Sequence, residues 1–201
     1  LAVTDEMRVV IGGQSARLVV NLDDLGMYDA VMSVVVRPTS IKRDDGRILG
    51  LRADVACDSG AYSTYPLTAV LEPMGTVQIM PGPYRVPAYA YTTAAVATNK
   101  CPVGAYRGVG MAVGVLVMER LIDTLAVAAG CDPAEIRRRN LIGPDEFPYA
   151  AVTGLVYDSG RYGDVLAAAL AAFRYDDARR EQARLREHGR LIGIGLATFV
   201  E

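Results

Sequence analysis

Residues 44–57 read Asp-Asp-Gly-Arg-Ile-Leu-Gly-Leu-Arg-Ala-Asp-Val-Ala-Cys, and this stretch decides the fold class. From residue 47 onward, apolar side chains alternate with glycine, alanine or charged ones, which is typical of a strand with one buried face. The β-branched run over residues 31–36 predicts a second strand, and Asp44-Asp45-Gly46 favours a tight turn between the two. We therefore predict an antiparallel hairpin over residues 31–57.

The rest of the chain predicts strands and helices in an irregular order. Asp132 precedes Pro133, which is the arrangement of an N-cap followed by a first-turn proline, so a short helix is expected to begin there. Charged residues mark the expected exposed side of the helix before it, namely Glu119, Arg120 and Asp123. The expected elements are strands over 76–80, 87–98 and from 191, and helices over 110–129, 133–139, 163–173 and 176–188. This order indicates an α+β fold with mixed sheets and packed helices.

Composition excludes several classes of protein. Apolar residues make up 51% of the chain, and 21 basic against 23 acidic side chains provide no basic field for nucleic acid or an anionic membrane. The longest apolar run, 109–118, is shorter than the roughly 20 residues of a membrane span. Three scattered cysteines fit a reducing, cytoplasmic compartment, and the single histidine, His188, excludes a multi-histidine metal site.

A glycine-containing loop that runs into a helix is the strongest candidate for a binding site. Its residues are Ala105, Tyr106, Arg107 and Gly108. Backbone N–H groups there can point at an oxygen-rich ligand. Alternatively, the glycines only let the helix pack tightly on the sheet, with Arg107 in a surface ion pair. Gly108, Gly110 and Gly114 also resemble a dinucleotide fingerprint, but a proline-containing loop precedes them, so an NAD(P)-binding dehydrogenase is a minor alternative.

Other chemically suggestive residues are assigned structural roles. Asp54 and Asp58 are interpreted as solvated or as capping the turn at Ser59-Gly60, rather than as paired catalytic carboxylates. The three arginines at 137–139 suit a helix C-terminus. Cys101 has no base or metal ligand near it in sequence and is interpreted as an ordinary loop or core residue.

Seven short motifs occur in a fixed order. They are DGRI (45–48), DSGAY (58–62), AYRG (105–108), ERLID (119–123), DPAEIRRRNLI (132–142), FPY (147–149) and YDSG (157–160). Together they resemble the molybdenum-binding large subunit of the molybdenum hydroxylases, the family of xanthine dehydrogenase, aldehyde oxidase and the large chain of aerobic carbon monoxide dehydrogenase. The resemblance covers roughly residues 44–201.

The resemblance implies a cofactor, a reaction and partners. Molybdopterin with molybdenum, in its cytosine dinucleotide form, would lie beside Ala105, Tyr106, Arg107 and Gly108. The reaction would be oxidative hydroxylation of a small molecule such as an aldehyde or N-heterocycle. Electrons would leave through [2Fe–2S] clusters and FAD, on an iron–sulfur small subunit and an FAD-binding medium subunit. Gly108 replaces the cysteine of true carbon monoxide dehydrogenases, so copper-bridged chemistry is not expected.

The resemblance also implies domain boundaries. Residues 1–142 would be the C-terminal part of the first molybdopterin-binding domain, and 143–201 a connector and the start of the second. The family's catalytic glutamate would lie beyond Glu201, so no catalytic residue or metal ligand is expected in this chain. With Leu1 at its start and an apolar run near its end, the chain is interpreted as a fragment that is inactive alone. The alternative is a non-catalytic scaffold or assembly subunit of the same fold.

Overall fold

In the computed structural model of this protein, a mixed four-stranded sheet forms the base of the molecule. The described residues are 18–21, 32–37, 46–63, 65, 69–102, 104 and 107–200. The strands are β1 (Leu18–Asn21), β2 (Met32–Arg37), β3 (Leu51–Gly60) and β4 (Tyr89–Ala97), in that spatial order. The β1–β2 and β2–β3 pairs are antiparallel and the β3–β4 pair is parallel. The predicted mixed sheet and antiparallel β2–β3 pair are confirmed, whereas Asp44 and Asp45 of the expected turn lie outside the described residues.

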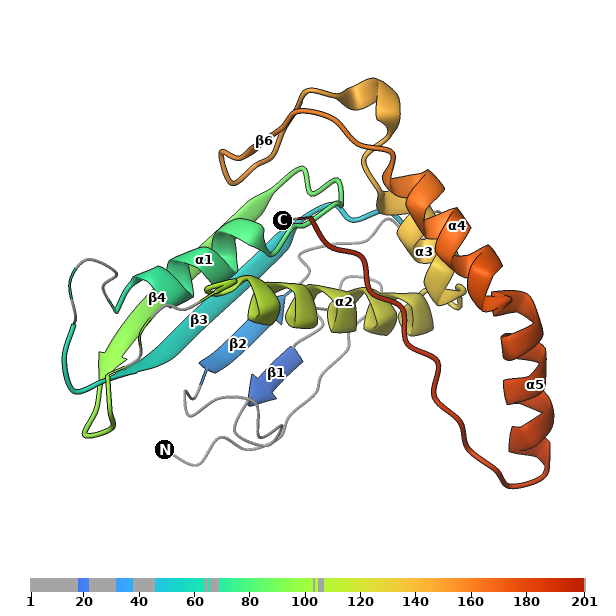
Figure 1. Cartoon of the computed structure of the whole chain (residues 1–201), viewed down its shortest axis with the longest axis horizontal. Coiled ribbons are helices and arrows are strands. Elements are labelled where there is room, and N and C mark those ends of the chain that lie inside the picture. The colour runs from blue at the N-terminus through green and yellow to red at the C-terminus, as the bar shows by residue number, and fades with distance from the viewer. Residues whose placement is uncertain are drawn as a thin grey trace.

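Two helices cover one face of this sheet (Figure 1). On β3, the predicted alternation is confirmed, because Leu51, Ala53 and Val55 are buried while Arg52 and Ala56 are exposed. Helix α1 (Leu71–Ile79) packs on β3 and β4, and α2 (Met111–Ala128) packs on α1 and reaches β1 and β2. The buried face of β3 and these helices share one hydrophobic core.

The strand expected over residues 76–80 is wrong, because these residues belong to the end of α1 and the turn after it. A short apolar run cannot be assigned to strand or helix by periodicity alone. The topology decides here, since parallel neighbours such as β3 and β4 require a crossover connection, which α1 provides. The Thr76 hydroxyl donates to the carbonyl oxygen of Glu72 at 2.9 Å, within this helix.

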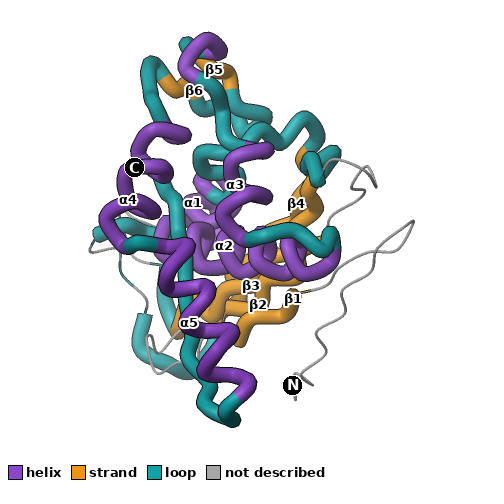
Figure 2. Tube along the Cα trace, turned by 90° about the vertical axis from the view of Figure 1, so that its right-hand side faces the viewer, coloured by secondary structure: helices purple, strands orange, loops and turns teal. Residues whose placement is uncertain are grey.

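The helices after α2 follow the sequence signals closely. Helix α3 (Pro133–Asn140) begins where predicted, and the Asp132 carboxylate accepts hydrogen bonds from the backbone N–H groups of Ala134 and Glu135. Helices α4 (Tyr162–Phe173) and α5 (Tyr175–Glu187) also agree with expectation. Between them and α3, the expected connector contains a 3-10 helix (Pro144–Glu146) and a small hairpin of β5 (Tyr149–Ala150) and β6 (Val156–Tyr157). Figure 2 shows α3 on the side of α2 that faces away from the sheet.

The C-terminal segment, residues 190–200, returns across α2 toward α1 (Figure 1). The strand expected from residue 191 is wrong within the described residues, because the segment is extended but joins no sheet. Side-chain contacts hold it instead. Arg137 Nη2 donates to the carbonyl oxygen of Leu196 at 2.8 Å, and the hydroxyls of Tyr84 and Thr198 are 2.6 Å apart. No helix in the described part of the chain combines the length and apolar character needed to cross a membrane.

Candidate functional site

The loop before α2 presents an open glycine. Ala105 and Tyr106 lie outside the described residues, whereas Arg107 and Gly108 are described and exposed. Gly108 has a φ of +57°, and a Cβ atom added there would meet no atom within 4 Å. A ligand can therefore approach the backbone closely at this point.

The N-terminus of α2 follows directly. Gly110 is its N-cap residue and has no side chain that could cap the helix, and its first turn holds no acidic residue. The first N–H groups of a helix have no intrahelical partner and carry partial positive charge. One of them, on Met111, donates to the carbonyl oxygen of Gly108 at 2.9 Å. The arrangement fits an oxygen-rich or anionic group placed against the start of α2.

Two glycines of the same stretch serve helix packing. A Cβ on Gly110 would lie 2.3 Å from the backbone nitrogen of Thr76, and one on Gly114 would lie 2.8 Å from Cγ2 of Ile79. Both glycines therefore face α1. The expected tight packing is present, but its partner is α1 rather than the sheet. This use of Gly110 and Gly114 argues against a dinucleotide fingerprint.

An apolar pocket of about 280 Å³ adjoins Gly108. One wall is formed by α2 and the other by the C-terminal segment; its lining residues are Gly108, Met111, Ala112, Val115, Phe199 and Val200. The contribution of Phe199 and Val200 was not predicted from the sequence. No local pattern signals it, because these two residues reach the pocket through the anchoring of Leu196 and Thr198 described above.

Glu72 is a further residue near the loop that was not predicted from the sequence. Its carboxylate accepts a hydrogen bond from the backbone N–H of Gly110, from the α1 side of the loop. Burial raises the pKa of Glu72, and the hydrogen bond from Gly110 offsets part of this effect. A carboxyl group with a raised pKa thus lies directly behind the start of α2.

We expect Glu72→Gln to raise the melting temperature of the intact protein at pH 7 and to leave it unchanged below about pH 4. Because burial raises the folded-state pKa, the unfolded chain ionises Glu72 first, and this residue lowers stability as pH rises through that range. Glutamine keeps the acceptor for Gly110 but cannot ionise. Thermal unfolding at both pH values checks this, with the exposed Glu187→Gln as a control. Equal shifts at both pH values would contradict it.

Asp58 and Asp54 are confirmed as structural residues. Asp58 accepts hydrogen bonds from the N–H of Gly60 at 3.0 Å and the hydroxyl of Thr98 at 2.5 Å. The hydrogen bond from Thr98 is the main cause of the lowered pKa of Asp58. Asp54 accepts a hydrogen bond from the hydroxyl of Thr92 at 2.7 Å. Both carboxylates brace β4 against β3 and do not form a catalytic pair.

Arg137 has a structural role, as predicted. Its contacts also explain why the predicted exposure of Glu119 is wrong. Glu119 was expected on the exposed side of α2, but it is 5% exposed, because Arg137 binds its carboxylate. The Arg137 guanidinium is itself fully buried and also binds Asp123 at 2.9 Å. The ion pair makes burial of the Glu119 charge possible.

A match to a protein-family model supports the family resemblance that the sequence motifs indicate. The model of the molybdopterin cofactor-binding domain matches residues 39–141, which include β3, α1, β4, the loop, α2 and α3. The chain belongs to this family. The open Gly108 and the start of α2 both lie within the matched residues.

Curated relatives and solved structures agree with this family membership. The nicotine 6-hydroxylase large subunit of Paenarthrobacter nicotinovorans is 40% identical over 158 residues, covering 78% of this chain and 19% of that protein. The carbon monoxide dehydrogenase large chain of Hydrogenophaga pseudoflava is 40% identical over 162 residues, covering 78% of this chain and 20% of that one. Quinoline 2-oxidoreductase from Pseudomonas putida 86 superposes with a TM-score of 0.78 at 36% identity, covering 84% of this chain and 21% of the other. The chain thus spans about a fifth of these relatives.

Proposed function

We propose that this chain is part of a molybdenum-dependent oxidoreductase and that the loop of Ala105, Tyr106, Arg107 and Gly108 contacts the molybdopterin cofactor. The observation that carries the proposal is the open Gly108, which lies just before the start of α2 and beside an apolar pocket. Glycine allows close approach of the ligand, and the N–H groups of the helix start suit its oxygen atoms.

In this proposal the chain binds and orients the cofactor. When bound, the molybdenum–pterin group supplies the two-electron oxidation of a substrate. The backbone at Arg107 and Gly108 holds it, while Met111 and Phe199 exclude water on the neighbouring side. We assign no catalytic residue to this chain, so turnover requires residues of the longer protein.

Several finer features belong to the same proposal. The relatives' names mention nicotine, carbon monoxide and quinoline, which supports a small-molecule substrate such as an N-heterocycle or aldehyde. A further relative is named as a subunit of the 6-hydroxypseudooxynicotine dehydrogenase complex, which supports the existence of partner subunits. We propose that these partners carry [2Fe–2S] clusters and FAD. We also propose the cytosine dinucleotide form of the cofactor and a cytoplasmic location. A domain boundary after residue 142 is supported by the end of the family match at residue 141.

The test measures molybdenum and released pterin in the intact protein, purified from a host with active cofactor synthesis. Gly108→Asp is compared with Gly108→Asn, since both side chains tolerate a positive φ but only aspartate adds a negative charge. We expect Gly108→Asp to retain much less molybdenum than Gly108→Asn. The matched control is the same pair of substitutions at Gly130, which has a φ of +59° and open surroundings after the other end of α2.

The outcomes separate the alternatives. Equal molybdenum contents in the two Gly108 variants would remove the loop from the cofactor site. Native protein without molybdenum or pterin would favour the scaffold or assembly subunit. A stoichiometric cofactor, lost selectively in Gly108→Asp and not in Gly130→Asp, supports the proposal.

A further inference from the structure

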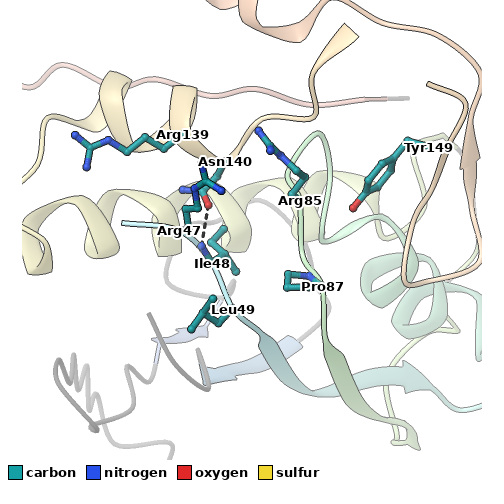
Figure 3. A pocket seen from close by; sticks show the side chains of 8 residues that line it. All are labelled: Arg47, Ile48, Leu49, Arg85, Pro87, Arg139, Asn140 and Tyr149. Atoms are coloured by element: carbon teal, nitrogen blue, oxygen red, sulfur yellow. Dashed lines mark hydrogen bonds between the residues drawn. The ribbon is translucent and has the colours of Figure 1, made fainter. Parts of the chain in front are cut away.

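A second pocket, of about 310 Å³, lies at the opposite end of the sheet from the proposed cofactor loop. It is formed where β3 and β4 begin, whereas the loop follows the end of β4. Three arginines from separate segments line it, namely Arg47, Arg85 and Arg139. Figure 3 shows Arg47 directly beside Asn140, with Arg139 on one side of them, Arg85 on the other, and Tyr149 beyond Arg85.

Asn140 fixes the backbone around Arg47. This residue is 2% exposed, and its Nδ2 donates to the carbonyl oxygens of Gly46 at 2.9 Å and Ile136 at 2.8 Å. Its Oδ1 accepts a hydrogen bond from the N–H of Ile48 at 2.8 Å. The peptide groups on both sides of Arg47 are thus attached to the end of α3. A buried side chain with this many partners sets the position of Arg47 at the pocket.

Arg85 is held in place by the same segment. Its backbone N–H donates to the carbonyl oxygen of Asn140 at 2.8 Å, and its Nε and Nη2 donate to that of Leu141 at 3.1 and 2.7 Å. Nε also lies 3.5 Å from the carboxylate of Glu146. These contacts orient the guanidinium before any ligand binds, and its Nη1 has no partner among the described residues. A preoriented donor loses less conformational entropy on binding.

Basic side chains predominate over acidic ones among the described residues that line the pocket. No carboxylate is among the described lining residues, and the apolar Ile48 and Pro87 lie beneath the arginines (Figure 3). Two glutamates lie nearby: Glu146 beside Arg85, and Glu135, whose carboxylate binds both Arg138 and Arg139.

We propose that this pocket binds the oxyanion group of a small organic molecule, through Arg47 and Arg85, with Arg139 at the rim. Guanidinium groups bind phosphates and carboxylates in a bidentate manner, and the charge of the ion strengthens each hydrogen bond. The apolar floor and the ring of Tyr149 suit a hydrophobic body attached to that group. The pocket volume lies at the lower end of the range for small-molecule sites.

The experiment titrates the intact protein with phenyl phosphate, benzoate, inorganic phosphate and phenol by calorimetry at low salt. We expect saturable binding of an aromatic anion, tighter than that of inorganic phosphate, and none of neutral phenol. Comparison of phenyl phosphate with benzoate tells whether the group recognised is a phosphate or a carboxylate. Arg47→Ala and Arg85→Ala should each weaken binding by at least about tenfold.

The matched control is Arg138→Ala, which removes an exposed arginine of the same helix, next to Arg139 but outside the pocket lining. Arg47→Lys and Arg85→Lys keep the charge and should still weaken binding, which guards against misfolding of the alanine variants. Absence of saturable binding at millimolar concentrations overturns the proposal. Equal weakening by Arg138→Ala also overturns it, because that result indicates only general attraction to basic side chains. Molybdenum content should stay constant in all these variants, so this test fails or succeeds independently of the proposed function.

Discussion

Replacing Arg137 with methionine is expected to lower the free energy of unfolding by about 3–5 kcal/mol, because it leaves the carboxylate of Glu119 buried without its partner. Arg137 is fully buried, and its Nε and Nη2 lie 3.0 and 2.9 Å from Oε2 of Glu119. A buried charge without a partner is among the few changes with so large a cost.

The hydrogen bonds of Arg137 explain why no other side chain can replace it. Nη1 donates to Asp123 and to the carbonyl oxygen of Pro133, and Nη2 donates to Glu119 and to the carbonyl oxygen of Leu196. Together with Nε, these contacts use all five N–H groups of the guanidinium. One side chain thereby joins α2, α3 and the C-terminal segment.

Urea unfolding of the intact protein measures the effect, with Arg138→Met as the control on the same helix. Arg138 is half exposed, and among the described residues it pairs only with Glu135 at 3.5 Å, so its loss should cost less than about 1 kcal/mol. The double variant Arg137→Met, Glu119→Leu should recover part of the loss, since an apolar pair removes the buried charge. Equal destabilisation by the Arg137 and Arg138 variants would contradict the assignment.

The same substitution should also affect the pocket beside Gly108. Without the bond to Leu196, the C-terminal segment keeps only its weaker contacts, including the Tyr84–Thr198 hydrogen bond. Phe199 and Val200 line that pocket and directly follow Thr198. Hydrogen exchange over residues 190–200 should therefore be faster in Arg137→Met than in Arg138→Met.

Local signals predicted local structure well. The cap at Asp132 and the alternation of β3 depend on residues close together in sequence, and both were correct. The helical state of residues 76–80 and the burial of Glu119 depend on partners far along the chain. The α1 crossover follows from β3–β4 pairing, and Glu119 is buried because Arg137, on the next helix, faces it. Neither partner is visible in a local window of sequence.

The functional site could be predicted only in part for the same reason. The glycine pattern pointed to the loop at Gly108, because glycine signals close approach of some other group. The neighbouring residues in the sequence do not indicate which group approaches the glycine. The group close to Gly110 is the backbone of α1, whereas the space beside Gly108 is open. The Arg47–Arg85 pocket depends on Asn140, which lies 92 residues from Ile48 in sequence and has no pattern that links the two.

Gly110→Ala is expected to lower the free energy of unfolding by at least about 3 kcal/mol, through two additive causes. The φ of +72° at Gly110 is unfavourable for any residue with a Cβ. In addition, the Cβ would lie 2.3 Å from the nitrogen of Thr76 and 2.5 Å from the carbonyl oxygen of Glu72. These are backbone atoms of α1, so relief of the clash requires that α1 and α2 move apart.

Gly130→Ala separates the two causes. Gly130 has a similar φ of +59°, but a Cβ there would meet no atom within 4 Å, so only the conformational cost of about 1–2 kcal/mol remains. The difference between the two variants in urea unfolding measures the contact between α1 and the start of α2. Because that contact also positions the loop at Gly108, Gly110→Ala should retain less molybdenum than Gly130→Ala. Equal losses of stability at the two glycines would mean that α1 does not press against Gly110, and that the open glycine at position 108 is held by some other part of the protein.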